Sequence, residues 1–101
     1  MYFVYILKSL INRKTYVGRT KKTPLKRLKE HNIGTNAWTK NNRPFELIYF
    51  ESYICKEDAI RREGYLKSGI GNKLVALIRD NFNSIYQSSA SPTGRPPRGW
   101  G

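Results

Sequence analysis

The sequence predicts an α+β fold in which helices flank a small three-stranded antiparallel β-sheet, in the order β-β-α-β-α-α. Three observations support this prediction. An unbroken apolar run occupies residues 2–7, a proline-initiated helix start follows at Thr23, and residues 56–81 contain two segments with helical spacing. The chain of 101 residues has room for one small domain, and its 39% hydrophobic residues support a folded core.

The first two elements are expected to pair as antiparallel strands. Residues 2–7 are rich in β-branched and aromatic side chains, which is typical of a strand that is buried on both faces. Residues 12–14 form a polar turn, and residues 15–18 are expected to be the returning strand. Gly18 would let another backbone or a ligand come close to that strand.

The first helix is expected to run from Thr23 to about Asn32. Thr23 supplies a capping hydroxyl, Pro24 suits the first helical position, and Gly34 is placed to end the helix. Leu25 and Leu28 are expected to make the contacts of this helix with the core.

The later elements are one strand and two helices. Residues 35–44 are mostly polar, and a third strand is expected at residues 46–52. A second helix fits residues 56–67 and a third fits residues 72–81. The apolar residues at helical spacing in the third helix are Leu74, Leu77 and Ile78.

Residues 1–83 are expected to form the domain, followed by a flexible tail at residues 84–101. The tail is rich in Ser, Pro, Gly and Arg, a composition that does not bury a core. Arg95 and Arg98 are a weak basic signal, so the tail is expected to be inert rather than a phosphate-binding arm.

The composition indicates a polyanionic partner. The formal net charge is +12, from 19 Lys and Arg against 7 Asp and Glu, and nucleic acid is favoured over no polyanionic partner. The single cysteine, Cys55, excludes an internal disulfide and a multi-cysteine zinc site. No apolar run approaches the ~20 residues of a membrane span, and no signal peptide is visible, so a cytoplasmic protein is expected.

Arg27 and His31 are candidates for chemistry on a phosphate. They are four residues apart in the first predicted helix, so their side chains leave the same face. With Leu25 and Leu28 holding the helix to the core, both are expected to point elsewhere. The guanidinium would then clamp a phosphate and the imidazole would accept or relay a proton. The alternative is a solvated surface face.

Glu63 interrupts an apolar stripe. Ala59, Ile60 and Leu66 fall on one side of the predicted helix, and Glu63 lies among them. A carboxylate in such a place needs a compensating charge. A hard cation such as Mg²⁺ would compensate it and suit a phosphate substrate. A salt bridge to Arg61, Arg62 or another basic residue would compensate it equally, and the pattern leaves both open.

Tyr5 and Tyr16 lie eleven residues apart, which suits two paired strands with a turn between them. A free phenol has a pKa near ~10 and is a poor base at neutral pH. These tyrosines would therefore orient a water or pass a proton to His31, the single histidine of the chain. The alternative is that both tyrosines are ordinary core residues.

Five basic residues are candidates for nucleic-acid binding. Arg19, Lys21 and Lys22 follow Gly18 closely and would supply charge beside Tyr16, unless they form a solvated turn. The five candidates are Arg19, Lys21, Lys22, Lys40 and Arg43.

This ordered set resembles the GIY-YIG nuclease superfamily, in particular its small stand-alone bacterial members. Phe3-Val4-Tyr5 and Tyr16-Val17-Gly18 are similar to the two signature segments, although Phe3 and Val4 replace the named glycine and isoleucine. Arg27 and His31 match the family's first helix, and Glu63 matches its metal-binding glutamate. The resemblance covers residues 2–80 and supports the fold predicted above.

The resemblance implies a hydrolytic cut that uses one divalent metal ion, Mg²⁺ or Mn²⁺, held by Glu63. Arg27 would neutralise charge on the phosphoryl oxygens, and Tyr16, relayed through His31, would activate or orient the attacking water. Tyr5 would help to shape the site. Further roles implied by the resemblance are a phosphate contact for Arg19 and a contribution to the site from Asn72.

The expected function is therefore that of a metal-dependent endonuclease acting on DNA. Relatives with sequence specificity often carry a separate recognition domain, for which the chain has no room, so single-stranded or branched repair and recombination intermediates are the expected substrates. Trp38, Tyr65 or Phe45 would stack on unpaired bases, whereas core packing is the alternative for each and is favoured for Phe45. The rival functions are a non-catalytic nucleic-acid-binding module and a subunit that cuts only with a protein partner.

Overall fold

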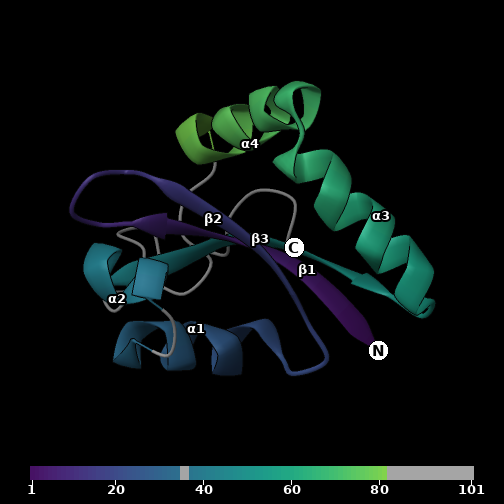
Figure 1. The fold of residues 1–101 in the computed structure, drawn as a ribbon, viewed down its shortest axis with the longest axis horizontal. Helices are drawn as coiled ribbons and strands as arrows, with labels where there is room; N and C mark the ends of the chain where they lie inside the picture. The colour runs from purple at the N-terminus through teal and green to yellow at the C-terminus, as the bar shows by residue number, and fades with distance from the viewer. Residues whose placement is uncertain (35–36, 82–101) are drawn as a thin grey trace, which may run out of the picture.

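A three-stranded sheet lies between two layers of helices (Figure 1). The structure is a computed structural model and describes residues 1–34 and 37–81. The elements are β1 (Tyr2–Ser9), β2 (Thr15–Thr20), α1 (Pro24–Ile33), α2 (Ala37–Asn42), β3 (Phe45–Tyr53), α3 (Lys56–Lys67) and α4 (Gly69–Asn81). The α+β class and the order of the predicted elements are confirmed, and the structure adds the short helix α2.

Strand β1 is the centre of the sheet and pairs antiparallel with both neighbours, giving the order β2-β1-β3. Its residues Val4, Tyr5, Ile6 and Leu7 are buried, as predicted for a strand covered on both faces. In this register Tyr5 lies opposite Gly18 on β2 and opposite Phe50 on β3. The hairpin therefore brings the two tyrosine segments of the sequence side by side.

The two faces of the sheet belong to two separate hydrophobic clusters, because successive side chains of a strand alternate between faces. The face toward α1 is packed by Tyr5, Leu7, Leu28, Phe45 and Leu47. The face toward α3 and α4 is packed by Val4, Ile6, Val17, Ile48, Ala59, Leu66, Val75 and Ile78. Figure 1 shows α1 and α2 on one side of the sheet and α3 and α4 on the other.

The ends of α1 follow the sequence signals. Thr23 is the N-cap, and its side chain accepts a hydrogen bond from the backbone N–H of Lys26, while Pro24 begins the helix. Gly34 ends the helix in the left-handed conformation, with φ of 93°, which favours glycine. Both predicted boundaries are therefore confirmed.

Three sequence expectations about the other helices are wrong. Helix α4 begins at Gly69 rather than Asn72, because its first turn continues almost directly from α3. Leu77 is 60% exposed and Ile60 is 42% exposed, so neither joins the core. The buried positions of α4 are Gly71, Val75 and Ile78, which lie one helical turn apart, so Ile78 joins the core as expected, and Leu74 packs against it in part.

Gly71 explains why α4 packs so closely on the end of α3. A Cβ atom at this position would lie within van der Waals overlap of the backbone of Tyr65 and Leu66. Glycine is the residue that permits this approach, and the tight turn between the helices follows from it.

An ionic network joins β3 to α3. Glu51 accepts hydrogen bonds from Tyr49 and Tyr53, each at 2.6 Å, and from Arg62 Nη2 at 2.9 Å. Burial opposes ionisation of Glu51, but the hydrogen bonds from Arg62 and the two phenols hold its pKa below the usual range. This network fixes α3 against the sheet beside the turn of helix that carries Glu63.

Replacing Glu51 with glutamine is expected to destabilise the fold by about 2 kcal/mol, because it leaves Arg62 without its charged partner in a largely enclosed place. The measurement is urea denaturation of wild type and variant. Asp58→Asn is the control, since Asp58 and Arg61 form an exposed ion pair on the same helix. The control should change stability by less than about 0.5 kcal/mol, and an equal loss in both variants would contradict the assignment.

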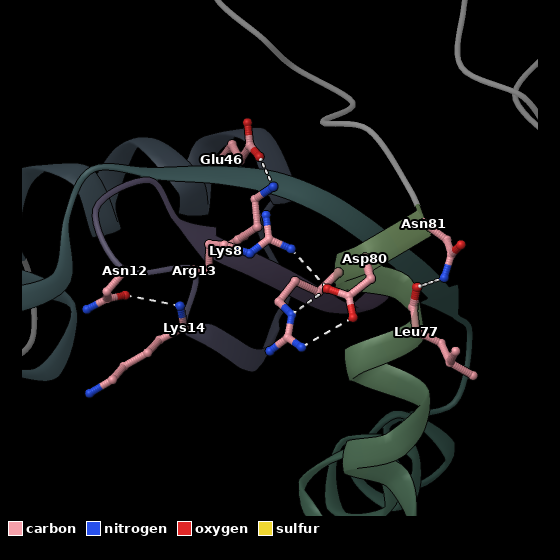
Figure 2. Close-up of polar contacts among 9 residues, drawn as sticks. Lys8, Asn12, Arg13, Lys14, Glu46, Leu77, Asp80 and Asn81 are labelled. Atoms are coloured by element: carbon pink, nitrogen blue, oxygen red, sulfur yellow. Dashed lines mark hydrogen bonds and ion pairs between the residues drawn. The ribbon is translucent and has the colours of Figure 1, made fainter.

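Figure 2 shows how the turn between β1 and β2 is fixed to the end of α4. Arg13, at φ of 62°, donates from Nη2 to Asp80 Oδ1 at 2.9 Å. Arg79 Nε donates to the same oxygen at 3.0 Å. On the neighbouring strands, Lys8 Nζ lies 2.8 Å from Glu46 Oε1. Arg13 thus links the turn to α4, and the Lys8–Glu46 pair joins β1 to β3 across the sheet.

The predicted tail, residues 84–101, lies outside the residues that the structure describes. Across residues 1–34 and 37–81, no helix combines the length and the apolar character that a transmembrane span requires.

Candidate active site

The centre of the site is a cluster of three rings from three elements. Tyr5 Oη on β1 lies 2.8 Å from His31 Nε2 on α1, within hydrogen-bonding distance. The ring centroids of Tyr16 and His31 are 4.8 Å apart, and those of Tyr5 and Tyr16 are 6.2 Å apart. The structure thus brings together both signature tyrosines and the single histidine.

The position of His31 corrects the expectation that it points away from the core. Its side chain is fully buried, and that of Leu28 is buried, at 7% exposure, whereas Leu25 is only partly buried. Helix α1 therefore presents Leu28 and His31 to the same face of the sheet. The imidazole of His31 can lie in the core because the phenol of Tyr5, on the sheet, provides its hydrogen bond.

Burial, followed by the positive charge of Arg27, lowers the pKa of His31 to about 4. Burial also raises the pKa of Tyr5 to about 12. At neutral pH both groups are therefore uncharged. Among the described residues, His31 Nδ1 is a buried nitrogen with no hydrogen-bond partner. Whichever ring nitrogen of His31 carries the proton, Tyr5 and His31 form a hydrogen bond between two uncharged groups.

The stability of the protein is expected to fall as the pH is lowered from about 7 to about 4.5. The unfolded histidine, with its ordinary pKa of 6.5, binds a proton in this range, whereas folded His31, with a pKa of about 4, does not. The unfolded state gains the proton first, so about 2–3 kcal/mol of stability should be lost through His31 by pH 4.5. Below that pH the carboxylates of Glu51 and Glu30, whose pKa values are lowered in the fold, should add a further loss. Urea denaturation across this pH range measures the loss.

The control for this prediction is His31→Phe, which removes the titrating group and keeps an aromatic ring in the pocket. The variant should lack the loss of stability between pH 7 and 4.5, whatever its absolute stability. An equal loss in both proteins would show that other groups cause it.

Arg27 lies one turn before His31 at the edge of the cluster. Its side chain is 23% exposed and forms an ion pair with Glu30, which also pairs with Lys22. Hydrogen bonds from Lys22 and Arg27 lower the pKa of Glu30 to about 2. The charge of Arg27 also lowers the pKa of Tyr5 against the effect of burial. A guanidinium thus faces the tyrosines at the rim of the site.

Glu63 reaches the site from the opposite helical layer. Its Oε1 lies 3.1 Å from Arg19 Nε on β2, and its Oε2 lies 3.0 Å from Lys67 Nζ on α3. The side chain is 19% exposed, so it sits at the rim rather than in the core. Its negative charge adds to the effect of burial that raises the pKa of Tyr5.

Of the two interpretations of Glu63 from sequence, the structure displays the ion pair, but its partners are new. Arg61 pairs with Asp58 and Arg62 pairs with Glu51, so neither compensates Glu63. Lys67 was missed by the sequence reasoning. A basic residue four positions after a glutamate in a predicted helix is the signal that could have identified it.

The described residues can hold a metal ion through one carboxylate. No group of three or more His, Cys, Asp or Glu side chains lies together within residues 1–34 and 37–81. Mg²⁺ and similar ions often bind through one or two carboxylates, with waters and substrate phosphates completing the coordination. Glu63 at an open, basic rim fits that mode.

Gly18 leaves the space that the tyrosines occupy. A Cβ atom on Gly18 would lie 2.5 Å from Tyr5 Cζ and 2.9 Å from Tyr16 Cε2. The close approach anticipated at Gly18 is thus made by the side chains of the site itself.

The remaining basic candidates have diverse surroundings. Lys21 lies over the ring of Tyr2, with Nζ 5.6 Å from the centroid, and Lys22 pairs with Glu30. Lys40 is exposed on α2. Arg43 donates from Nη1 to the backbone oxygen of Ile33 at 2.7 Å, and so caps the C-terminal end of α1.

The candidate stacking residues differ in their exposure. Phe45 is buried in the cluster under α1, which agrees with core packing, and Tyr65 is 42% exposed on α3. The cation of Arg62 lies 5.5 Å from the centroid of the Tyr65 ring. The Trp38 side chain lies outside the described part of the structure. Asn72 is exposed on α4.

Comparison with known proteins agrees with this arrangement. The model of the GIY-YIG catalytic domain matches residues 1–73. The UPF0213 protein CPE1444 of Clostridium perfringens is 39% identical over 79 residues, covering 77% of this chain and 83% of that protein. The UPF0213 protein YazA of Bacillus subtilis is 38% identical over 84 residues, covering 82% and 83%. A UPF0213 protein of Staphylococcus aureus is 36% identical over 80 residues, covering 78% and 95%.

Proposed function

Because the chain belongs to the GIY-YIG family, and its relatives are the small UPF0213 proteins, we propose that it is a metal-dependent endonuclease that hydrolyses phosphodiester bonds in DNA. The observation that carries this proposal is the meeting of two half-sites at β2. The tyrosine–histidine cluster and Arg27 come from the α1 side of the sheet, and Glu63 comes from the α3 side. The net charge of +12 favours a polyanionic substrate.

The residues of the cluster divide the chemistry between them. Arg27 binds a phosphoryl oxygen and stabilises the charge that develops on it. Tyr16 orients the attacking water, and His31, whose ring centroid lies 4.8 Å from that of Tyr16, would relay its proton onward without remaining charged. Tyr5, kept protonated by its raised pKa, fixes His31 through the bond at 2.8 Å. Each proposed role uses the protonation state that burial favours at neutral pH.

Glu63 would hold the divalent ion, Mg²⁺ or Mn²⁺. When bound, such an ion supplies Lewis-acid stabilisation of a phosphate oxygen. We also assign Arg19, which contacts Glu63 directly, to a phosphate of the substrate. Lys21, Lys22, Lys40 and Arg43 are the further basic residues that we assign to DNA binding.

We assign single-stranded or branched DNA as the preferred substrate. Tyr65 is an exposed ring with the cation of Arg62 over it, a combination that suits stacking on an unpaired base. We expect the activity in the cytoplasm, where the exposed thiol of Cys55 would remain reduced.

The test is a cleavage assay with single-stranded, duplex and branched DNA of the same sequence, each with Mg²⁺, Mn²⁺ or a chelator. We expect metal-dependent cutting of the single-stranded and branched forms, and none by Glu63→Ala. Binding of all three forms without cutting by any of them would instead support the non-catalytic module. Cutting that appears only after addition of a cell extract would support the partner-dependent subunit.

A further inference from the structure

We propose that Arg19 and Lys67 form an exchangeable pair of cations on Glu63. In the free protein they neutralise the carboxylate, and when a divalent metal ion takes the carboxylate they transfer to DNA phosphates. Metal and DNA would therefore bind cooperatively. This inference rests on the proposed function and deepens it, because it assigns both side chains a task in loading the site.

The geometry of Glu63 is that of a carboxylate shared between two separate cations. Arg19 approaches Oε1 from the strand β2, and Lys67 approaches Oε2 from the next turn of α3. The two cationic side chains are more exposed than the carboxylate between them, at 34% and 52% against 19%. Both cations can therefore turn toward solvent while Glu63 stays in place.

Glu51 and Glu63 differ in the number and the rigidity of their contacts. Arg62 approaches both oxygens of Glu51 with its Nε and Nη2 atoms, and Tyr49 and Tyr53 also donate to these oxygens. That network combines phenols with a partly buried guanidinium, so it fixes structure. At Glu63 the contacts come from a lysine on a flexible stem and from one guanidinium nitrogen. Glu63 and Glu51 have similar exposure, at 19% and 16%, so the fewer and more flexible contacts of Glu63, rather than its burial, are what allow its cations to be released.

Charge balance couples the release to DNA. A metal ion that binds Glu63 adds two positive charges beside Arg19 and Lys67 and removes their counterion. These repulsions make metal binding weak in the free protein, because like charges at this distance oppose each other even when partly screened. A DNA phosphate supplies the missing negative charge. By thermodynamic reciprocity, DNA must strengthen metal binding by the same factor by which metal strengthens DNA binding.

The experiment measures Mn²⁺ affinity by the electron paramagnetic resonance signal of free Mn²⁺, with and without a single-stranded phosphorothioate oligonucleotide that resists cleavage. We expect the oligonucleotide to raise the affinity of wild type about 10-fold, a typical allosteric coupling. Lys67→Gln should bind Mn²⁺ several-fold more tightly than wild type without DNA and show a smaller coupling. Glu63→Gln should lose both the binding and the coupling.

Lys73→Gln is the matched control, because it removes the same charge from an exposed position on α4. It should leave Mn²⁺ affinity within about 2-fold of wild type, as expected for an exposed, screened charge that is not an ion-pair partner of Glu63. The inference is overturned if Lys67→Gln weakens Mn²⁺ binding or leaves it unchanged, if DNA leaves the affinity of wild type unchanged, or if no Mn²⁺ binds at Glu63.

A parallel assay with ordinary DNA and Mn²⁺ separates this inference from the proposed function. Cutting of ordinary DNA without any coupling would reject the exchange of cations and keep the nuclease. Coupling without cutting would reject the nuclease and keep the exchange.

Discussion

Replacing Glu63 with glutamine is expected to lower DNA cleavage by about 10³-fold or more, because the variant loses the anionic oxygen that would anchor the metal ion. The fold should persist, since Glu63 lies at the rim and its ion pairs with Arg19 and Lys67 are partly exposed. DNA binding should be retained or become tighter, because the variant frees two cations and gains one unit of positive charge. Cleavage rates under single-turnover conditions and DNA affinity at fixed salt measure the two effects.

The matched control for this variant is Glu57→Gln, which removes a carboxylate from an exposed position in the first turn of the same helix. It should cut DNA at a rate within a few-fold of wild type. Unchanged cleavage by Glu63→Gln, with wild-type stability, would contradict the role assigned to Glu63. A parallel loss in both variants would indicate that net charge, rather than a metal site, controls the rate.

Replacing Gly18 with alanine is expected to lower cleavage about 10²-fold and to destabilise the protein by about 1–3 kcal/mol, the cost of overpacking a filled site. The added methyl group would overlap the phenol of Tyr5 and the ring of Tyr16. Both rings face the proposed reaction, so their displacement should reduce kcat more than substrate affinity. Single-turnover rates at saturating DNA, together with urea denaturation, separate the two consequences.

Gly64→Ala is the control for Gly18→Ala. A Cβ atom on Gly64 meets no other atom within 4 Å, and the position is inside α3. Alanine should therefore stabilise the helix by about 1 kcal/mol. If Gly18→Ala kept full activity and stability, the packing of the two tyrosines over Gly18 would not matter for the site.

Local signals in the sequence were sufficient for most of the fold. The apolar run of β1 predicted a central strand, and Thr23, Pro24 and Gly34 predicted both ends of α1. These features depend on residues near one another in the chain. Helix α3 was likewise predicted with its observed bounds, Lys56–Lys67, because the spacing of its residues is a local signal.

The features that the sequence did not predict depend on contacts between segments that are far apart in the chain. The burial of His31 follows from a phenol on β1, 26 residues earlier, which supplies its hydrogen bond. The early start of α4 depends on the fit of Gly71 against the backbone of Tyr65, and the partner of Glu63 on β2 depends on how α3 crosses the sheet. Residue types predicted the members of the candidate site, whereas their partners required the packed structure.

Because side chains alternate along β2, each face of this short strand has its own task. Tyr16 and Gly18 serve the ring cluster on one face, while Val17 packs in the other core and Arg19 meets Glu63 there. A slip of this strand by a single residue would exchange all four side chains between the faces. Such a slip would turn Arg19 toward the ring cluster and Tyr16 toward the other core, and would dismantle both halves of the site at once. A hairpin in the wrong register would therefore be unstable as well as inactive. Misassembled molecules would unfold rather than persist as folded but inactive protein.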